Sequence, residues 1–143
     1  MPKMIFVNLP VSDLARADAF YLALGAEKNA QFSDPTGSMM AFSDIIHVML
    51  LTHDKFRQFT PKPIADATRT SEVLLCISAD SREAVDALVD KVGPAGGRAD
   101  PAPKQDYGFM YGRSFEDPDG HIWEVMWMDV EAAKAAGTET TAA

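Results

Sequence analysis

The strongest constraint on the fold is a pattern of segments that occurs twice along the 143 residues. In the first half, an apolar stretch at 4–11 precedes apolar residues at helical spacing up to Leu24, then Gly25 and three stretches that favour strands. In the second half, the stretch 72–78 precedes a helical pattern over 81–92 and a pair of strands, and Asp80 aligns with Asp13. Repeated supersecondary units usually bury their apolar faces against each other. The sequence therefore predicts two copies of a βαβββ module.

The segment between the two copies contains Pro61 and Pro63 and has no sustained apolar period, which is typical of a connector. We therefore expect one domain over residues 1–129, with module one at 1–56, the connector at 57–70 and module two at 71–129. The tail at 130–143 is rich in Ala and Thr, so we expect a short helix that is partly disordered.

Charge and hydropathy exclude several classes of partner. The formal net charge is -8, and such an acidic chain has no basic surface to neutralise nucleic acid or anionic lipid. A small uncharged or cationic ligand is favoured instead. No apolar stretch reaches the length of a membrane span, and the N-terminal apolar run is too short for a signal peptide. We expect a cytoplasmic protein.

The single cysteine, Cys76, lies in the apolar run VLLCI, which predicts a thiol buried in the core. One cysteine cannot form a disulfide within the chain. The sequence also offers no Ser-His-Asp or Cys-His arrangement around its three histidines, which argues against a nucleophilic hydrolase.

The turn Asp117-Pro118-Asp119-Gly120 predicts a hairpin, because Pro presets φ at one corner and Gly accepts a positive φ. In the strand that follows, side-chain alternation places Trp123 and its neighbours at 125 and 127 on one face, expected to pack beneath a helix. Glu124 lies on the other face among apolar residues, so that face is predicted to be wet or functional. Glu124 is a candidate metal ligand, general base or polar anchor for a cationic or hydroxylated ligand; alternatively, it pairs with Arg113 or a lysine.

Other candidate residues are largely apolar, which is typical of a cleft for an aromatic or apolar small molecule. Phe6 and Asn8 share a strand face, as do Val73 and Leu75 in the duplicate strand. Tyr107, Phe109 and Tyr111 alternate along the strand paired with that of Glu124, and Met126 follows Glu124 on its face; cross-strand aromatic packing and ordinary core packing are the alternatives.

Three motifs carry a family resemblance: VNLPVSDLARADAFYLALG at 7–25, VMLLT at 48–52 and SFEDPDGHIWEV at 114–125. With these motifs, residues 4–129 resemble the vicinal oxygen chelate superfamily, which includes glyoxalase I, bleomycin-resistance proteins and extradiol dioxygenases. The resemblance implies an α+β fold of two tandem βαβββ modules, whose curled mixed sheets form a cleft with the helices outside. It also implies a homodimer, with a cleft that is sometimes shared between chains.

In metal-bearing members of that superfamily, four cleft positions supply ligands to one divalent ion. By resemblance these positions are Phe6, Leu50, Val73 and Glu124, of which only Glu124 can bind a metal. His47 and His121 are candidate further ligands if a strand bulge shifts the register. Otherwise His47 is a half-buried, hydrogen-bonded strand residue and His121 faces solvent. The cofactor is then Zn, Ni, Mn or Fe, or no metal at all.

The sequence leaves two functions open. In the first, the protein is a glyoxalase-like lyase, isomerase or dioxygenase in which Glu124 and His47, or a residue of a partner chain, hold a divalent metal. In the second, it is a metal-free protein that sequesters a small molecule, such as a drug, between apolar walls.

Overall fold

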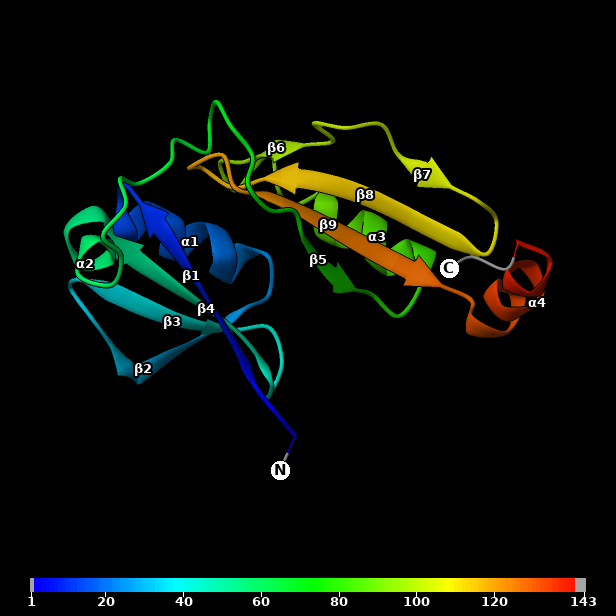
Figure 1. The fold of residues 1–143 in the computed structure, drawn as a ribbon, viewed down its shortest axis with the longest axis horizontal. Helices are drawn as coiled ribbons and strands as arrows, with labels where there is room; N and C mark the ends of the chain where they lie inside the picture. The colour runs from blue at the N-terminus through cyan, green and yellow to red at the C-terminus, as the bar shows by residue number, and fades with distance from the viewer. Residues whose placement is uncertain (1, 141–143) are drawn as a thin grey trace.

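The computed structural model describes the backbone of residues 2–140 and the side chains of residues 2–136. A four-stranded sheet forms the first half, with helix α1 (Leu14–Ala23) packed against its central strands (Figure 1). The first and last strands of the module lie side by side and parallel. In order across the sheet, the strands are β1 (Ile5–Val11), β4 (Ile46–Thr52), β3 (Gly37–Ala41) and β2 (Glu27–Asp34).

The second half repeats this topology, and its helix α3 (Arg82–Val89) packs against two strands of a five-stranded sheet. Again the first and last strands of the module are parallel neighbours. The strands are β5 (Leu75–Ser78), β9 (Ile122–Met128), β8 (Met110–Glu116) and β6 (Arg98–Ala99), while β7 (Gln105–Asp106) also pairs with β8. The predicted α+β fold with two copies of one module is thus confirmed.

Two helices lie outside the repeat. Helix α2 (His53–Arg57) was missed from the sequence; it begins where the Thr52 side chain accepts a hydrogen bond from the Lys55 amide. Helix α4 (Val130–Thr140) occupies the tail, where a short helix was expected. Partial disorder of the tail at 130–143 stays a prediction, and residues 141–143 lie outside the described residues. Among the described residues, no helix combines the length and apolarity needed to cross a membrane.

Helix capping corrects the alignment of the two modules by one residue. Asp13 caps α1 by accepting a hydrogen bond from the Arg16 amide, whereas Ser81, not Asp80, caps α3 through the Ala84 amide. Strand register agrees, because Asn8 pairs with Met49 in the first module and Cys76 pairs with Glu124 in the second. Asn8 therefore corresponds to Cys76, and every face assigned from the Asp13–Asp80 alignment shifts by one residue in the second module.

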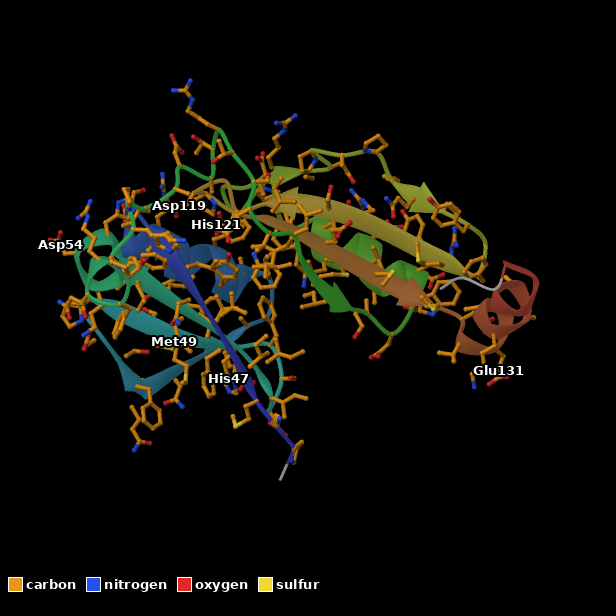
Figure 2. All side chains as sticks on the ribbon, viewed as in Figure 1. His47, Met49, Asp54, Asp119, His121 and Glu131 are labelled. Atoms are coloured by element: carbon orange, nitrogen blue, oxygen red, sulfur yellow. The ribbon has the colours of Figure 1, made fainter. Side chains whose placement is uncertain are left out.

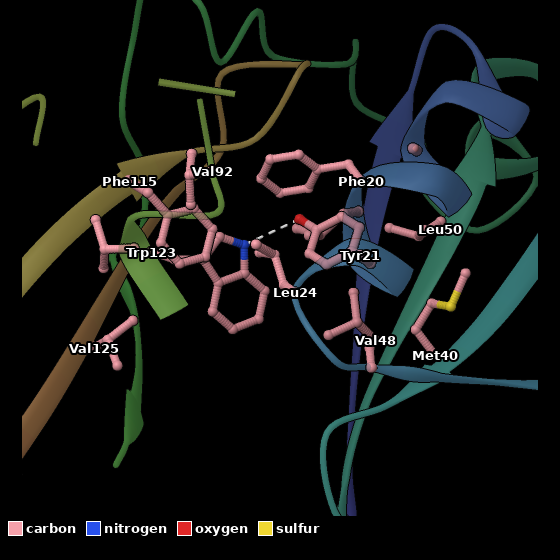
Figure 3. Close-up of a cluster of buried hydrophobic side chains, with 14 of the residues drawn as sticks. Phe20, Tyr21, Leu24, Met40, Val48, Leu50, Val92, Phe115, Trp123 and Val125 are labelled. Atoms are coloured by element: carbon pink, nitrogen blue, oxygen red, sulfur yellow. Dashed lines mark hydrogen bonds between the residues drawn. The ribbon is translucent and has the colours of Figure 1, made fainter. Parts of the chain in front are cut away.

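The hydrophobic core lies between the helices and the sheet faces that they cover (Figure 3). Trp123 is 2% exposed and packs against Phe42, Phe115 and Tyr21 at ring-centroid distances of 5.5, 6.3 and 6.2 Å. Because Tyr21 belongs to the first module and Trp123 to the second, one aromatic cluster joins the two halves. The prediction that Trp123 is a core residue is confirmed.

The turn between β8 and β9 ties the second module to the first. Its Asp117 side chain is buried and accepts hydrogen bonds from the Tyr21 hydroxyl at 2.6 Å and the His121 amide at 2.9 Å. Asp119 accepts from the backbone and hydroxyl of Ser12, just before α1. Desolvation raises the pKa of both Asp117 and Tyr21. The hairpin predicted from Asp117–Gly120 is therefore also the joint between the modules.

Beneath the second sheet, Arg113 is a buried cation surrounded by carboxylates. Its guanidinium lies 2.6 Å from Asp100, 2.9 Å from Asp90 and 3.0 Å from Asp86. Hydrogen bonding to Arg113 lowers the pKa of Asp100, and bonds from Tyr111 and then Arg113 lower that of Asp86. Leaving the guanidinium without partners would be costly, so these contacts fix β8 against α3.

Replacing Trp123 with Ala should lower the free energy of unfolding by about 3–5 kcal/mol, because a large buried ring leaves a cavity. Urea denaturation followed by circular dichroism measures this change without relying on tryptophan fluorescence. Val130→Ala is the control, since Val130 is 56% exposed and should change stability by less than about 0.5 kcal/mol. A loss below about 1 kcal/mol for Trp123→Ala would refute the burial of this ring.

Asp100→Asn should lower the free energy of unfolding by about 1–2 kcal/mol at pH 7, because it removes a charge-assisted bond to Arg113. Since the folded pKa of Asp100 lies below its unfolded value, its contribution is present above about pH 4 and is lost as pH falls. The difference between the two proteins should therefore shrink toward pH 3. Asp54→Asn, at a fully exposed pair with Arg57, should show little effect at either pH. A difference independent of pH would contradict the role of the Asp100 charge.

Candidate functional site

Helix α1 covers one face of the first sheet and α3 covers one face of the second, and we call the opposite face of each sheet the open face. Alternation along β9 places Trp123 and Val125 beneath the helices and Glu124 and Met126 on the open face. The predicted division of this strand is confirmed. Cross-strand partners bring Cys76 of β5 and Ser114 of β8 beside Glu124 on the same face.

Glu124 lines a hollow of about 200 Å³ in the open face of the second sheet, which we call the Glu124 pocket. Gly112 has no side chain to fill the space beside Met126, its partner on β9. The wall is the loop before β7, held where the Ser114 hydroxyl accepts a hydrogen bond from the Ala102 amide at 3.3 Å. The pocket is lined by Cys76, Ala102, Pro103, Gln105, Gly112, Arg113, Ser114, Glu124, Val125 and Met126.

The Glu124 side chain is half-buried, and it makes no ion pair or side-chain hydrogen bond with the described part of the chain. The alternative partner suggested from the sequence, Arg113, is instead held by three aspartates beneath the sheet. That alternative is wrong, because Arg113 pairs with Val125 on β9 and shares its helix-covered face. The carboxylate is thus free to accept a hydrogen bond from a ligand that enters the pocket.

Cys76 is exposed, so the prediction of a buried core thiol is wrong. The cause is register: Cys76 pairs with Glu124 and shares its open face, while Leu75 and Ile77 pack against the core. Desolvation in the pocket raises the pKa of the Cys76 thiol, and the negative charge of Glu124 raises it further. The thiol is therefore a weak nucleophile that adds a soft, polarisable wall to the pocket.

Two residues predicted to line a cleft lie on the covered faces instead. Leu50 is fully buried in the core, and it is Met49 that pairs with Asn8 and faces outward. Tyr111 is 8% exposed and its hydroxyl donates to Asp86 of α3 at 2.7 Å. Tyr107 and Phe109 form the bend before β8, where their rings stack 6.4 Å apart, and neither lines the Glu124 pocket.

His47 and Phe6 lie together on the open face of the first sheet, where their rings stack 4.8 Å apart. Because Leu50 faces the core, alternation places His47 and Met49 on the same outward face; both lie on the first sheet in Figure 2. His47 is only 8% exposed, and its Nδ1 has no hydrogen-bond partner among the described residues. The expectation of a hydrogen-bonded histidine is therefore wrong for this nitrogen.

The remaining cleft candidates line a second hollow between the two modules. Asn8, Val73 and Leu75 contribute to it, together with Ile122 at the start of β9. His121 also lines it rather than facing solvent freely: its Nε2–H donates to the carbonyl oxygen of Pro10 at 2.8 Å, beside the end of β1 (Figure 2). The predicted site residues are thus divided between the two hollows, the covered faces, the open face of the first sheet and the bend before β8.

A divalent metal does not fit the donors that one chain supplies. On the open faces, strand register places Met49 where Leu50 was expected and Leu74 where Val73 was expected, and Phe6 offers no donor atom. Glu124 is then the only hard ligand of the four positions. In the described part of the chain, no three His, Cys, Asp or Glu residues lie close enough together to hold an ion.

Some pocket residues were not predicted from the sequence. Gly112 and Ser114 lie in an apparently ordinary strand, and only the register between β8 and β9 shows that they neighbour Glu124. Ala102, Pro103 and Gln105 lie in a proline-rich loop whose path depends on bonds to Ser114 and on the pairing of Gln105 with Gly112. Side-chain alternation in GFMYGRSF could have indicated that Gly112 and Ser114 share a strand face, but it could not have indicated the position of the loop.

Comparisons with known proteins agree with this architecture. Residues 3–125 match the Glyoxalase/Bleomycin resistance protein/Dioxygenase superfamily. A search of curated proteins found no match. The hypothetical protein SA1046 from S. aureus is 28% identical, with a TM-score of 0.73, 89% of this chain covered and 94% of that chain.

Two further solved structures share the fold at lower identity. An enzyme of the glyoxalase/bleomycin resistance protein/dioxygenase family from Burkholderia phytofirmans PsJN is 21% identical, with a TM-score of 0.71 and coverage of 89% of this chain and 99% of that one. The fosfomycin resistance protein FosX from Listeria monocytogenes is 19% identical, with a TM-score of 0.66 and coverage of 92% and 97%. From the match over residues 3–125, the chain belongs to the Glyoxalase/Bleomycin resistance protein/Dioxygenase superfamily.

Proposed function

We propose that the protein binds a small molecule in the Glu124 pocket without a metal ion. The observation that carries this proposal is a half-buried carboxylate that lines a hollow of about 200 Å³ and has no ion-pair partner in the described part of the chain. Such a group favours a ligand that brings its own cation or hydroxyl donor, since an unpaired carboxylate away from water is unfavourable. The rest of the ligand lies against Met126, Cys76 and Pro103.

Electrostatics support a cationic or hydroxylated ligand over an anionic one. The chain has a net charge of -8, which attracts cations and repels anions over distances of about 10 Å at moderate salt. Arg113 is a cation near the pocket, but three aspartates already surround it. Glu124 therefore favours a ligand that presents a positive charge or a hydroxyl group to this pocket.

We further propose that a second copy of the chain covers the free sheet edges. Strands β1 and β5 each pair on one side only in the described chain, and an unpaired edge is a ready template for association. Several large apolar side chains on or beside these edges are 42–57% exposed: Met4, Ile5, Phe6, Ile45, Val73 and Leu74. Burying this apolar surface favours a homodimer.

The metal-free binding site is tested by adding Ni²⁺, Zn²⁺, Mn²⁺ or Fe²⁺ to the purified protein, desalting it and measuring bound metal by mass spectrometry. We expect metal far below one ion per chain, because Glu124 is the only hard ligand at the four expected positions. Stoichiometric retention of one of these ions, lost in Glu124→Gln, would contradict the proposal and favour the metal-dependent enzyme.

Ligand preference is tested with benzylamine, benzyl alcohol and benzoate, using chemical-shift titrations of the protein amides. We expect benzylamine to bind more tightly than benzoate and to lose about five-fold in affinity in Glu124→Gln, as for a partly exposed ion pair worth about 1 kcal/mol. Glu83→Gln is the matched control, because Glu83 is exposed on α3 outside the pocket. Equal binding of benzylamine to both variants would refute the role of Glu124.

The dimer is tested by light scattering during size-exclusion chromatography. Leu74→Lys should shift the protein toward the monomer, because a charge beside the β5 edge opposes burial of that edge. Leu22→Lys is the control, since Leu22 is similarly exposed at 47% but lies on α1. A monomeric wild-type protein at micromolar concentration would refute this part of the proposal.

A further inference from the structure

A second hollow in the described part of the chain is distinct from the Glu124 pocket. It measures about 280 Å³ and lies between the modules, and we call it the inter-module pocket. Its floor includes Asn8 of β1, Leu75 of β5 and Ile122 of β9, and its outer wall is the connector around Ile64. The pocket therefore forms only when both modules and the connector are packed together.

The connector, which forms the outer wall, is held in place by packing and by hydrogen bonds. Gly120 has a φ of 90°, and a Cβ added there would lie 2.8 Å from the backbone of Ala67 and Thr68. Asp66 accepts hydrogen bonds from the Thr68 amide, and its carbonyl accepts from the amide of Thr70. The connector therefore forms a defined turn that packs directly on the joint between the modules.

Most residues that line the inter-module pocket are apolar, and its polar residues without a formal charge are Asn8, Thr60, Thr70, Ser71 and His121. Ile64, Val73 and Ile122 are among its apolar residues. Asn8 is an exposed residue whose amide side chain has no hydrogen bond to the described part of the chain. Lys62 and Glu72 also line the pocket, are exposed and make no ion pair with described residues, so the two ionic groups carry opposite charges and no net charge.

We propose that the inter-module pocket is a second binding site, for a small, uncharged and largely apolar molecule with one hydrogen-bonding group that meets Asn8. An apolar hollow with few polar groups is the usual form of a small-molecule site. Neither charge sign is selected within the pocket, because Lys62 and Glu72 line it together, and the net charge of -8 further disfavours an anion. The Glu124 pocket prefers the cation, so the two sites select different ligands.

The probe for this site is N-phenyl-1-naphthylamine, an uncharged fluorescent molecule with one N–H donor. Its sulfonated analogue, 8-anilinonaphthalene-1-sulfonate, tests the selection against negative charge. We expect the uncharged probe to bind with enhanced fluorescence and the sulfonate to bind at least about five-fold more weakly at low salt, with the difference shrinking as salt screens the charge.

Filling the pocket should abolish this binding. Ile122→Trp and Val73→Trp should each weaken binding of the uncharged probe by at least about ten-fold; Val73 is 55% exposed, so its variant should fold even if Ile122→Trp does not. Met126→Trp, which fills only the Glu124 pocket, should leave the probe bound while it blocks benzylamine. The two proposals can therefore fail separately.

Three results would overturn the second site. Binding of the uncharged probe that is unchanged in Val73→Trp would place the dye outside the inter-module pocket. Loss of the probe in Met126→Trp would place it in the Glu124 pocket. Equal or tighter binding of the sulfonate at low salt would refute the selection for an uncharged ligand.

Discussion

The arrangement of the whole chain depends on the bonds that the turn Asp117–Gly120 makes to the first module. Asp117 accepts from Tyr21, Asp119 accepts from Ser12, and His121 donates to Pro10, so three points of module one hold the beginning of β9. Trp123 then enters an aromatic cluster to which both modules contribute. Because β9 is fixed in this way, the orientation of every residue along it, Glu124 included, is fixed as well.

The position of the turn also explains why Ile122 and Glu124 line different hollows. Ile122 and Glu124 point to the same side of β9, two residues apart, but the connector packs over Gly120 and encloses only the space near Ile122. The space near Glu124 is enclosed by the loop that contains Ala102 and Pro103. A strand with one continuous open face therefore serves two pockets whose walls come from different loops.

Local patterns in the sequence were sufficient for the duplicated fold, for the turn and for the two faces of β9, because these depend on alternation and on Pro and Gly chemistry. They were insufficient for register between distant strands. Aligning Asp80 with Asp13 shifted the second module by one residue relative to the first. A shift of one residue in a strand exchanges its two faces. The assignment of Cys76 to the core failed because the apolar run VLLCI does not show which face of its strand is covered. The cleft assignment of Leu50 failed because both faces of β4 carry apolar residues. That of Tyr111 failed because its face was counted from Tyr107 and Phe109, which lie in the bend before β8.

The central claim is that Cys76 and Glu124 lie side by side in an open hollow, and alkylation of the native protein tests it most directly. The protein is incubated with iodoacetamide at pH 9, where the thiol of raised pKa is partly ionised, and the product is measured by intact mass. The account predicts complete modification of the single cysteine in the folded protein and weakened binding of benzylamine afterwards. A thiol that reacts only after unfolding, or a modified protein that binds benzylamine normally, would contradict it.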